Sequence, residues 1–410
     1  MTDAQTQTNR IIPGLFFSLF LILFGIYMAT YSGFVESRDA VRLLDATSSL
    51  VNYGDLILDE SGWQFILDEE LSGTYPFSAY PLDEWAMPYI VAILYQLADA
   101  IPRFGYVHTT WLLNILTASL TCVVFFKFAC DLGYNQRTAF VTALLLGAGT
   151  IVWVYSKTLF REPVSMLLLF VTGWGMYRWR EAPRQVVWLV FAGVSFFLAI
   201  FVETVSILSV PAFVALLIMG RWEPQGVVER IMDALLGLGL LLLIAISFSD
   251  LALDFFLGLT RDYLPLPDNT AFIGIALHSY LFSIGGSIWG TSPVLLLGLA
   301  GAIMFINTRQ RSIVWTVFLL ISAYAVVHAF FTGQHWFGGT SYPPRFLLPT
   351  VPFTMLLTLP VIDRLLQTDT NRFLKIGIAG IAIFSVIMQA IISVSLTTSY
   401  PGLLPLEANG

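Results

Sequence analysis

The chain has 410 residues, of which 57% are hydrophobic and only 11% are charged, and its formal net charge is −7. Soluble domains carry about 25% charged residues, so this composition excludes a soluble protein and indicates a polytopic membrane protein. The sequence holds no GxxxxGK[ST], GxGxxG or HExxH pattern, so nothing in it indicates an ATPase, a nucleotide-binding domain or a zinc hydrolase. We also expect no nucleic acid partner.

Long apolar runs recur along the whole chain. A helix needs about 20 apolar residues to cross the hydrocarbon of a bilayer. The run at 11–31 is too long for a signal-peptide core and no small-x-small site follows it, so we expect a retained first span. The other runs lie at about 109–131, 137–156, 159–179, 186–202, 204–220, 227–249, 291–306, 311–331, 345–366 and 373–398. The sequence thus predicts an all-α protein with about 11 transmembrane helices.

The run at 85–101 is borderline for a span, and the distribution of basic residues decides its placement. If it lies along the interface, 13 of the 20 Lys and Arg residues fall on the N-terminal side of the membrane. Basic residues favour the cytoplasmic side. We therefore expect a multi-pass protein of the cell membrane with a cytoplasmic N-terminus and an extracytoplasmic C-terminus.

With this orientation the acidic residues gather outside, and 12 of the 27 Asp and Glu residues lie between Glu36 and Asp99. Three outer segments, 32–108, 250–290 and 332–344, are long enough to build a site, and we treat 1–410 as one transmembrane domain. Asp99 and Glu203 lie near the outer interface, so we expect solvated acids there, although acids at membrane depth are usually functional.

The first outer segment begins with a short amphipathic pattern, "SRDAVRLLDATSSLV". Ser37 is a suitable helix cap, and Asp39 and Arg42 lie three residues apart, so they share one helix face. Gly54 and Asp55 then end the helix. This pattern predicts a helix that holds Asp39 near the end of the first span.

The second outer turn, "VYSKTLFREPVSM", carries Lys157, Arg161 and Glu162 at the start of a span, followed by Pro163. Proline suits the first turn of a helix. The positive end of that helix and two cations would form an anion site. The alternative is a charged pair that only anchors the helix at the interface.

The last outer turn, "GQHWFGGTSYPPRFLLP", places Arg345 at the N-terminus of a span, near Tyr342 and His335. The helix dipole disfavours a cation there, so this arginine indicates that an anion is held. A snorkelling arginine is the simpler alternative. His335 could bind a donor or an acceptor, or serve only as a structural histidine.

Taken together, the three turns would bring the carboxylates of Asp39 and Glu162 and the cations of Arg345, Arg161 and Lys157 to one membrane face. Chemistry at a lipid-linked phosphate needs this combination. A base removes a proton from an acceptor hydroxyl, and cations stabilise the phosphate as it leaves.

Four stretches in this order resemble the GT-C superfamily of membrane glycosyltransferases, in the group of the protein mannosyltransferases and the aminoarabinose transferases. Asp39-x-x-Arg42 with Gly54-Asp55 is similar to "DExRY…GD", and "YSKTLFREP" is similar to "YS.TLFSEP". The stretch "LFSIGGSIWGTSPVLLLGLAG" resembles "LLSPGKGLFLYSPLLLLGL". The last, "WFGGTSYPPRFLLPTVPF", resembles "WWGGWSYGPRYLLPALPF".

The resemblance implies a GT-C fold with interfacial helices in the first outer loop, and an inverting transfer from a polyprenyl-phosphate sugar to a lipid, glycan or protein acceptor. It maps the catalytic base onto Asp39, a second acid onto Glu162 and the arginine that faces the donor phosphate onto Arg345. Arg161, Lys157 and Tyr342 would help to bind that phosphate, with Arg42, His335 and Asp55 in support.

The chain also departs from these relatives. Ala40 stands where many of them have Glu, and Glu203-Thr204 stands where they often have Arg-Pro. The "SPGKG" lysine is missing at 283–287, and Lys157 or Arg161 would replace it. The sequence assigns no metal ligand, although the resemblance leaves room for a divalent metal ion.

Three other functions fit the sequence less well. A lipid transporter or flippase usually shows repeats and charges near the bilayer centre, whereas here the charges concentrate outside. A polysaccharide ligase that uses a lipid-diphosphate donor would also need outer arginines and a base. A scaffold whose outer loops bind a partner would need no chemistry at all.

Overall fold

The computed structural model describes residues 13–31, 33, 37–58, 84–101, 105–219, 227–249, 253, 271–306, 308–332, 342–367 and 371–398. Helices account for most of these residues, and none of them forms a β-strand. The predicted all-α fold class is confirmed. His335 lies outside the described residues.

Each apolar run of the sequence contains at least one helix. The single helices are α1 (Pro13–Ala29), α6 (Leu112–Asp131), α9 (Glu162–Glu181), α10 (Val187–Val202), α12 (Val227–Phe248), α17 (Arg311–Phe331) and α20 (Arg372–Thr398). In the described part of the chain, three helices are long and apolar enough to cross a membrane, and a bent pair adds a fourth. The protein is a multi-pass membrane protein, while the number of 11 spans stays a prediction.

The remaining spans are broken, and side chains bond to the backbone at the breaks. The broken helices are α7 (Gln136–Ala148) with α8 (Val152–Tyr155), α11 (Val210–Ile218) after the 3-10 turn η3 (Thr204–Ser209), and α16 (Leu297–Ile306) after α15 (Ile288–Thr291) and η4 (Pro293–Leu296). Ser385 of α20 donates to Gly149 O at 2.6 Å and accepts from Val294 N at 3.1 Å. Such side chains supply hydrogen bonds that lipid cannot.

The helix that carries Arg345 is also broken. It consists of η6 (Arg345–Thr350), α18 (Val351–Leu356) and α19 (Leu359–Leu366), and its two arms meet at 46°. Gly301 of α16 packs against this bend, because a Cβ built there would lie 1.6 Å from Leu357 O. A glycine is therefore required for α16 to approach the bent helix so closely.

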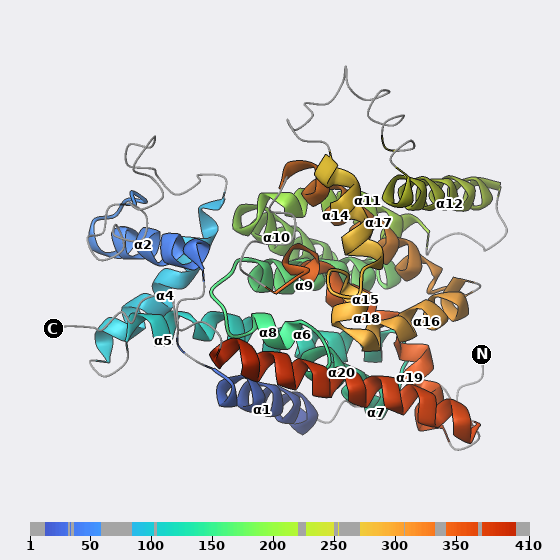
Figure 1. Cartoon of the computed structure of the whole chain (residues 1–410), viewed down its shortest axis with the longest axis horizontal. Helices are drawn as coiled ribbons and strands as arrows, with labels where there is room; N and C mark the ends of the chain where they lie inside the picture. Colours follow the sequence, from blue (N-terminus) through green and yellow to red (C-terminus); the bar gives the residue numbers. More distant parts are fainter. Residues whose placement is uncertain are drawn as a thin grey trace.

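The described parts of the first loop, which the sequence predicts to be outer, fold as a separate layer of short helices. This layer comprises α2 (Arg38–Asn52), α4 (Ala86–Ala100) and α5 (Tyr106–Thr110), which lie together on the left of the bundle (Figure 1). Leu44 of α2 and Met87 of α4 share one buried core with Trp111. The sequence predicted both α2 and α4, and the Ser37 side chain accepts a hydrogen bond from Ala40 N as the expected cap.

The two ends of α9 hold two different polar clusters. At its N-terminus Glu162 faces the first outer loop. At its C-terminus Arg178 pairs with Asp131 at 3.3 Å, and Arg180 donates to Ser312 Oγ at 2.7 Å. The predicted outer and inner charges thus lie at opposite ends of the bundle. The side that faces the cytoplasm stays a prediction.

Gly301→Ala should lower the thermal stability of the purified protein, because overpacking costs about 1–3 kcal/mol. Gly380→Ala is the matched control, since a Cβ at Gly380 of α20 meets nothing within 4 Å. Thermal unfolding in detergent measures both variants. Equal stability of the two would show that α16 does not need its close approach to the helix of Arg345.

Candidate active site

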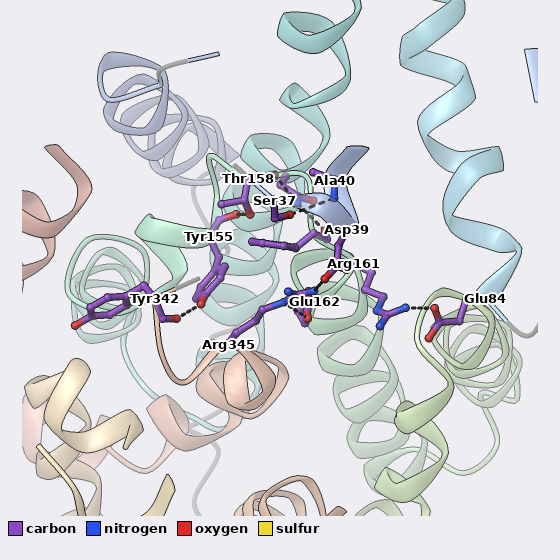
Figure 2. A network of polar contacts seen from close by, with 12 residues as sticks. Ser37, Asp39, Ala40, Glu84, Tyr155, Thr158, Arg161, Glu162, Tyr342 and Arg345 are labelled. Carbon is purple, nitrogen blue, oxygen red and sulfur yellow. Dashed lines mark hydrogen bonds and ion pairs between the residues drawn. The ribbon is translucent and has the colours of Figure 1, made fainter. Parts of the chain in front are cut away.

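Three outer turns, far apart in the sequence, meet at the N-terminal end of α9. Asp39 lies in the first turn of α2, Glu162 is the first residue of α9, and Arg345 is the first residue of η6. Figure 2 shows the Arg345 side chain extending toward the other two. The structure therefore brings these three predicted site residues together.

Arg345 bridges the two carboxylates. Its Nε donates to Glu162 Oε1 at 2.6 Å, and its Nη2 lies 2.8 Å from Asp39 Oδ2. The guanidinium carbon also lies 3.7 Å from the centroid of the Phe160 ring, a cation–π distance. The anion that the sequence required beside Arg345 is thus supplied, in this structure, by the protein's own carboxylates.

The two carboxylates differ sharply in exposure. The side chain of Glu162 is 1% exposed and that of Arg345 is 6% exposed, whereas that of Asp39 is 55% exposed. Glu162 also lies in the first turn of a helix, where the dipole favours a negative charge. Arg345 is therefore bonded on one side to the buried carboxylate of Glu162, and on the other side to the solvent-exposed carboxylate of Asp39.

The electrostatics of Asp39 follow from this arrangement. Partial burial raises the pKa of its carboxyl, but the charge and hydrogen bond of Arg345, with help from Arg161 and Arg42, outweigh burial and lower the pKa below its ordinary value. Asp39 is ionised at neutral pH. A group whose pKa is lowered by folding stabilises the protein above its unfolded pKa, and this contribution is lost as the pH falls through the folded pKa.

Buried side chains hold the turn that precedes Glu162. Asn114 of α6 donates from Nδ2 to both Thr158 O and Phe160 O at 2.7 Å. Tyr155 OH donates to Tyr342 O, which ties this turn to the segment before Arg345. These bonds fix Phe160 under the guanidinium and so set the position of the cation.

The two other predicted cations are already engaged. Arg161 forms an ion pair with Glu84, just before α4, as Figure 2 shows. Lys157 is buried, and its Nζ donates to Ser393 O of α20, away from Arg345. Of the cations expected at the phosphate, Arg345 and Arg161 therefore lie at the cluster, and Lys157 faces α20.

The remaining predicted residues lie around the cluster. Arg42 is exposed one turn along α2, close enough for its charge to act on Asp39. Asp55 accepts from Ser49 Oγ at 2.6 Å and from Ile57 N at 3.0 Å, and these bonds lower its pKa. The ring of Tyr342 points away from Arg345 (Figure 2).

Sequence reasoning missed three residues of this site. Glu203, expected to be solvated, is only 3% exposed at the end of α10. This expectation was wrong because the turn after α10 is covered by its neighbours. Asn114 and Glu84 were not singled out. Asn114 could have been found from the sequence, because its amide lies in the apolar run at 109–131. A buried polar group needs hydrogen-bond partners, so such an amide indicates a contact with another segment.

In the part of the chain that the structure describes, the two carboxylates of the cluster are bonded to Arg345, and a divalent metal ion at this site stays a prediction. Among the described residues, no three His, Cys, Asp or Glu side chains gather at one point. The guanidinium of Arg345 stands between Asp39 and Glu162. Magnesium and calcium take six or more oxygen ligands, and here two carboxylates already share one arginine.

The comparisons with known proteins give structural neighbours only. No family model and no curated protein matches the chain. Two structures of the Archaeoglobus fulgidus oligosaccharyltransferase, the apo form and the AglB complex with an inhibitory peptide and a dolichol-phosphate, match with a TM-score of 0.56. They are 11% and 12% identical and cover 93% of this chain, which spans 56% of theirs.

A third neighbour is ArnT from Cupriavidus metallidurans bound to undecaprenyl phosphate, with 15% identity and a TM-score of 0.47 over 94% of this chain and 75% of that one. The archaeal oligosaccharyltransferase fold confirms the GT-C fold that the sequence resemblance implied. The chain spans little more than half the length of those archaeal proteins.

Asn114→Ala should destabilise the turn before Glu162, because it leaves two buried carbonyls without donors, at about 1–3 kcal/mol for each. Thr121→Ala is the matched control on the same helix, since the buried Thr121 hydroxyl bonds, among the described residues, only to Thr117 O of its own helix. Thermal unfolding of both variants checks this. A larger loss in Thr121→Ala would contradict the role given to Asn114.

Glu162→Gln should destabilise the protein far more than Asp39→Asn does. Removing one partner of a buried pair costs about 3–5 kcal/mol because the other charge is left uncompensated. Asp39 is more than half exposed, so solvent replaces much of its interaction. Denaturation midpoints of the two variants measure the difference, and equal losses would refute the asymmetry.

Proposed function

We propose that this protein is an inverting glycosyltransferase that moves a hexosyl or pentosyl group from a polyprenyl-phosphate donor to an acceptor at the outer membrane face. One observation carries the proposal: a half-exposed carboxylate, Asp39, occupies the open side of an arginine that a buried carboxylate holds in place. A base and a phosphate-binding cation are thereby adjacent at the end of a membrane helix.

Donor binding would exchange the partners of Arg345. The phosphate of a polyprenyl-phosphate sugar is a diester with one negative charge, and arginine binds phosphate through two parallel hydrogen bonds. The phosphate would take the side of the guanidinium that Asp39 now occupies, while Glu162 and Phe160 keep the guanidinium in place. The polyprenyl chain would remain in lipid beside the apolar helices.

Asp39 would then act as the general base. Released from Arg345, its carboxylate regains basicity and accepts the proton of the acceptor hydroxyl. The acceptor oxygen bonds to the anomeric carbon, and the bond from that carbon to the phosphate oxygen breaks. The electron pair leaves with polyprenyl phosphate, whose charge Arg345 stabilises, with Arg161 nearby.

The fold supports this assignment. The AglB neighbour binds a dolichol-phosphate and an inhibitory peptide, which is consistent with a lipid carrier phosphate and an acceptor in this fold. The acceptor of the present chain is a lipid, a glycan or a protein. A lipid-diphosphate donor, as in a polysaccharide ligase, would engage the same arginine, so the donor has to be identified by experiment.

Asp39→Asn should abolish release of polyprenyl phosphate from a labelled lipid-linked sugar while the protein still inserts and folds. The amide keeps the shape of the side chain but accepts no proton. Asp99→Asn is the matched control, because Asp99 lies on α4 of the same loop and accepts a hydrogen bond from Tyr106 OH at 2.5 Å. Wild-type turnover by Asp39→Asn would refute the base assignment.

The same assay separates the alternative functions. A flippase or a scaffold would release no polyprenyl phosphate from any donor of a lipid-linked panel. A ligase would release polyprenyl diphosphate in place of the monophosphate. Either result with the wild-type protein would overturn the proposed donor.

A further inference from the structure

A second buried carboxyl, that of Glu203, lies near enough to Glu162 for the two charges to interact. Glu203 ends α10 in the turn before η3, beside the N-terminus of α9, because α9 and α10 pack against each other along their lengths. Both glutamates are almost completely buried, and Glu203 is 3% exposed. The Oε2 atom of each lacks a hydrogen-bond partner among the described residues. Neither orphaned oxygen takes part in the glycosyl transfer outlined above.

The charges around Glu203 leave it without a cation of its own. Arg345 is bonded to Glu162 and Asp39, and Arg161 is bonded to Glu84. Within the described residues, Glu203 forms no ion pair. The titratable and charged groups that act on it are Arg161 and Glu162 at the start of α9, Arg345 of η6 and Tyr324 of α17. His328 of α17 lies near Arg161 and Arg345.

Hydroxyl groups line the other side of Glu203. Ser165 lies beside its carboxyl and forms a 3.0 Å hydrogen bond with Ser206. Tyr324 OH and Ser209 Oγ are buried there and lack partners in the described part of the chain. Neutral hydroxyls can donate to a carboxyl but cannot balance a full negative charge in a buried site.

In the described part of the chain, Glu203 is a buried carboxyl near another carboxyl and has no cation bonded to it, and such a carboxyl favours its neutral form. Among the described residues, Arg345 is bonded to Glu162 and Asp39 and forms no ion pair with Glu203. Burial, followed by the charge of Glu162, raises the pKa of Glu203 to about 7. The geometry and the electrostatics thus agree that the proton of this pair resides on Glu203.

We propose that Glu203 is a proton-holding positioning residue, which keeps Arg345 available to a donor phosphate while neutral and draws it inward when ionised. The donor half of this proposal rests on the proposed function. An ionised Glu203 adds a second negative charge near the guanidinium, where it competes for Arg345 and repels an incoming phosphate. Donor affinity should therefore fall as the pH rises through neutrality.

The first test needs no donor. Infrared difference spectra of the purified protein should show the C=O band of a protonated carboxylic acid that disappears as the pH rises through about 7. Glu203→Gln should lack this band. The matched control Glu181→Gln should keep it, because Glu181 lies at the opposite end of α9 and pairs with Arg180 and Arg309. Persistence of the band in Glu203→Gln would overturn the proposal.

A second variant covers the case in which Glu203→Gln fails to fold. The Ser165 hydroxyl favours the ionised form of Glu203, so Ser165→Ala should shift the midpoint of the band to higher pH. An unchanged midpoint would mean that the proton resides on another group.

The second test measures binding of dolichol phosphate in detergent micelles, with dolichol that lacks the phosphate as the reference, at about pH 6 and about pH 8, on either side of a near-neutral pKa. Wild-type affinity should fall about tenfold between these values, an effect of ordinary electrostatic size. Glu203→Gln should bind equally at both values, and Glu203→Asp should restore the dependence on pH. The same fall in Glu203→Gln would refute the link between Glu203 and Arg345.

The two tests distinguish the two failures. If the wild-type protein binds no dolichol phosphate at either pH, the proposed function and the donor half of this inference are both overturned. The infrared band then decides independently whether Glu203 holds the proton.

Discussion

A buried arginine shared by two carboxylates holds this site together. Arg345 loses most of its hydration, and desolvation of that charge is costly unless both its partners and its geometry are good. Glu162 at 2.6 Å, Asp39 at 2.8 Å and the ring of Phe160 meet this requirement. Because the three charged residues come from positions 39, 162 and 345, this one interaction also fixes the first outer loop and the broken helix of Arg345 against the start of α9.

The difference between the two carboxylates gives the cluster its chemistry. If both carboxylates were buried, the ion pairs would only hold the structure together. If both were exposed, the ion pairs would contribute little to stability. Here the Glu162 side is closed and the Asp39 side is open, so an anion from outside can replace only Asp39. The same exchange that seats a phosphate on Arg345 would free a carboxylate beside it, which couples donor binding to activation of the base.

Much of this site could be predicted from the sequence, because a cation at a helix N-terminus and acids at the ends of spans are local patterns. Asp39, Glu162 and Arg345 were found in this way, as were the helices after Ser37 and Trp85.

The burial of Glu203 could not be predicted, because an acid at the end of an apolar run is expected to be solvated unless the packing of α9 and α10 is known. The positions of Lys157 and Asn114 depend on long-range contacts with α20 and with the turn before Glu162. Single-sequence patterns do not encode such contacts. The number of spans could not be read from hydropathy for a related reason. Several apolar runs that look continuous in the sequence contain helix breaks, and side chains of other helices form hydrogen bonds with the backbone at these breaks.

The charge of the cluster explains why the position of the proton matters. With Glu203 neutral, Asp39 and Glu162 contribute two negative charges against the one positive charge of Arg345, while Arg161 and Glu84 balance each other. Replacing Asp39 by a phosphate monoester or diester adds further negative charge at the same guanidinium. An ionised Glu203 would make the buried side of the cluster still more negative at the moment when the phosphate approaches, and in a medium of low dielectric that repulsion is poorly screened. If a phosphate binds to Arg345, a neutral Glu203 would spare it this repulsion, and burial together with the charge of Glu162 raises the pKa of Glu203 to about 7.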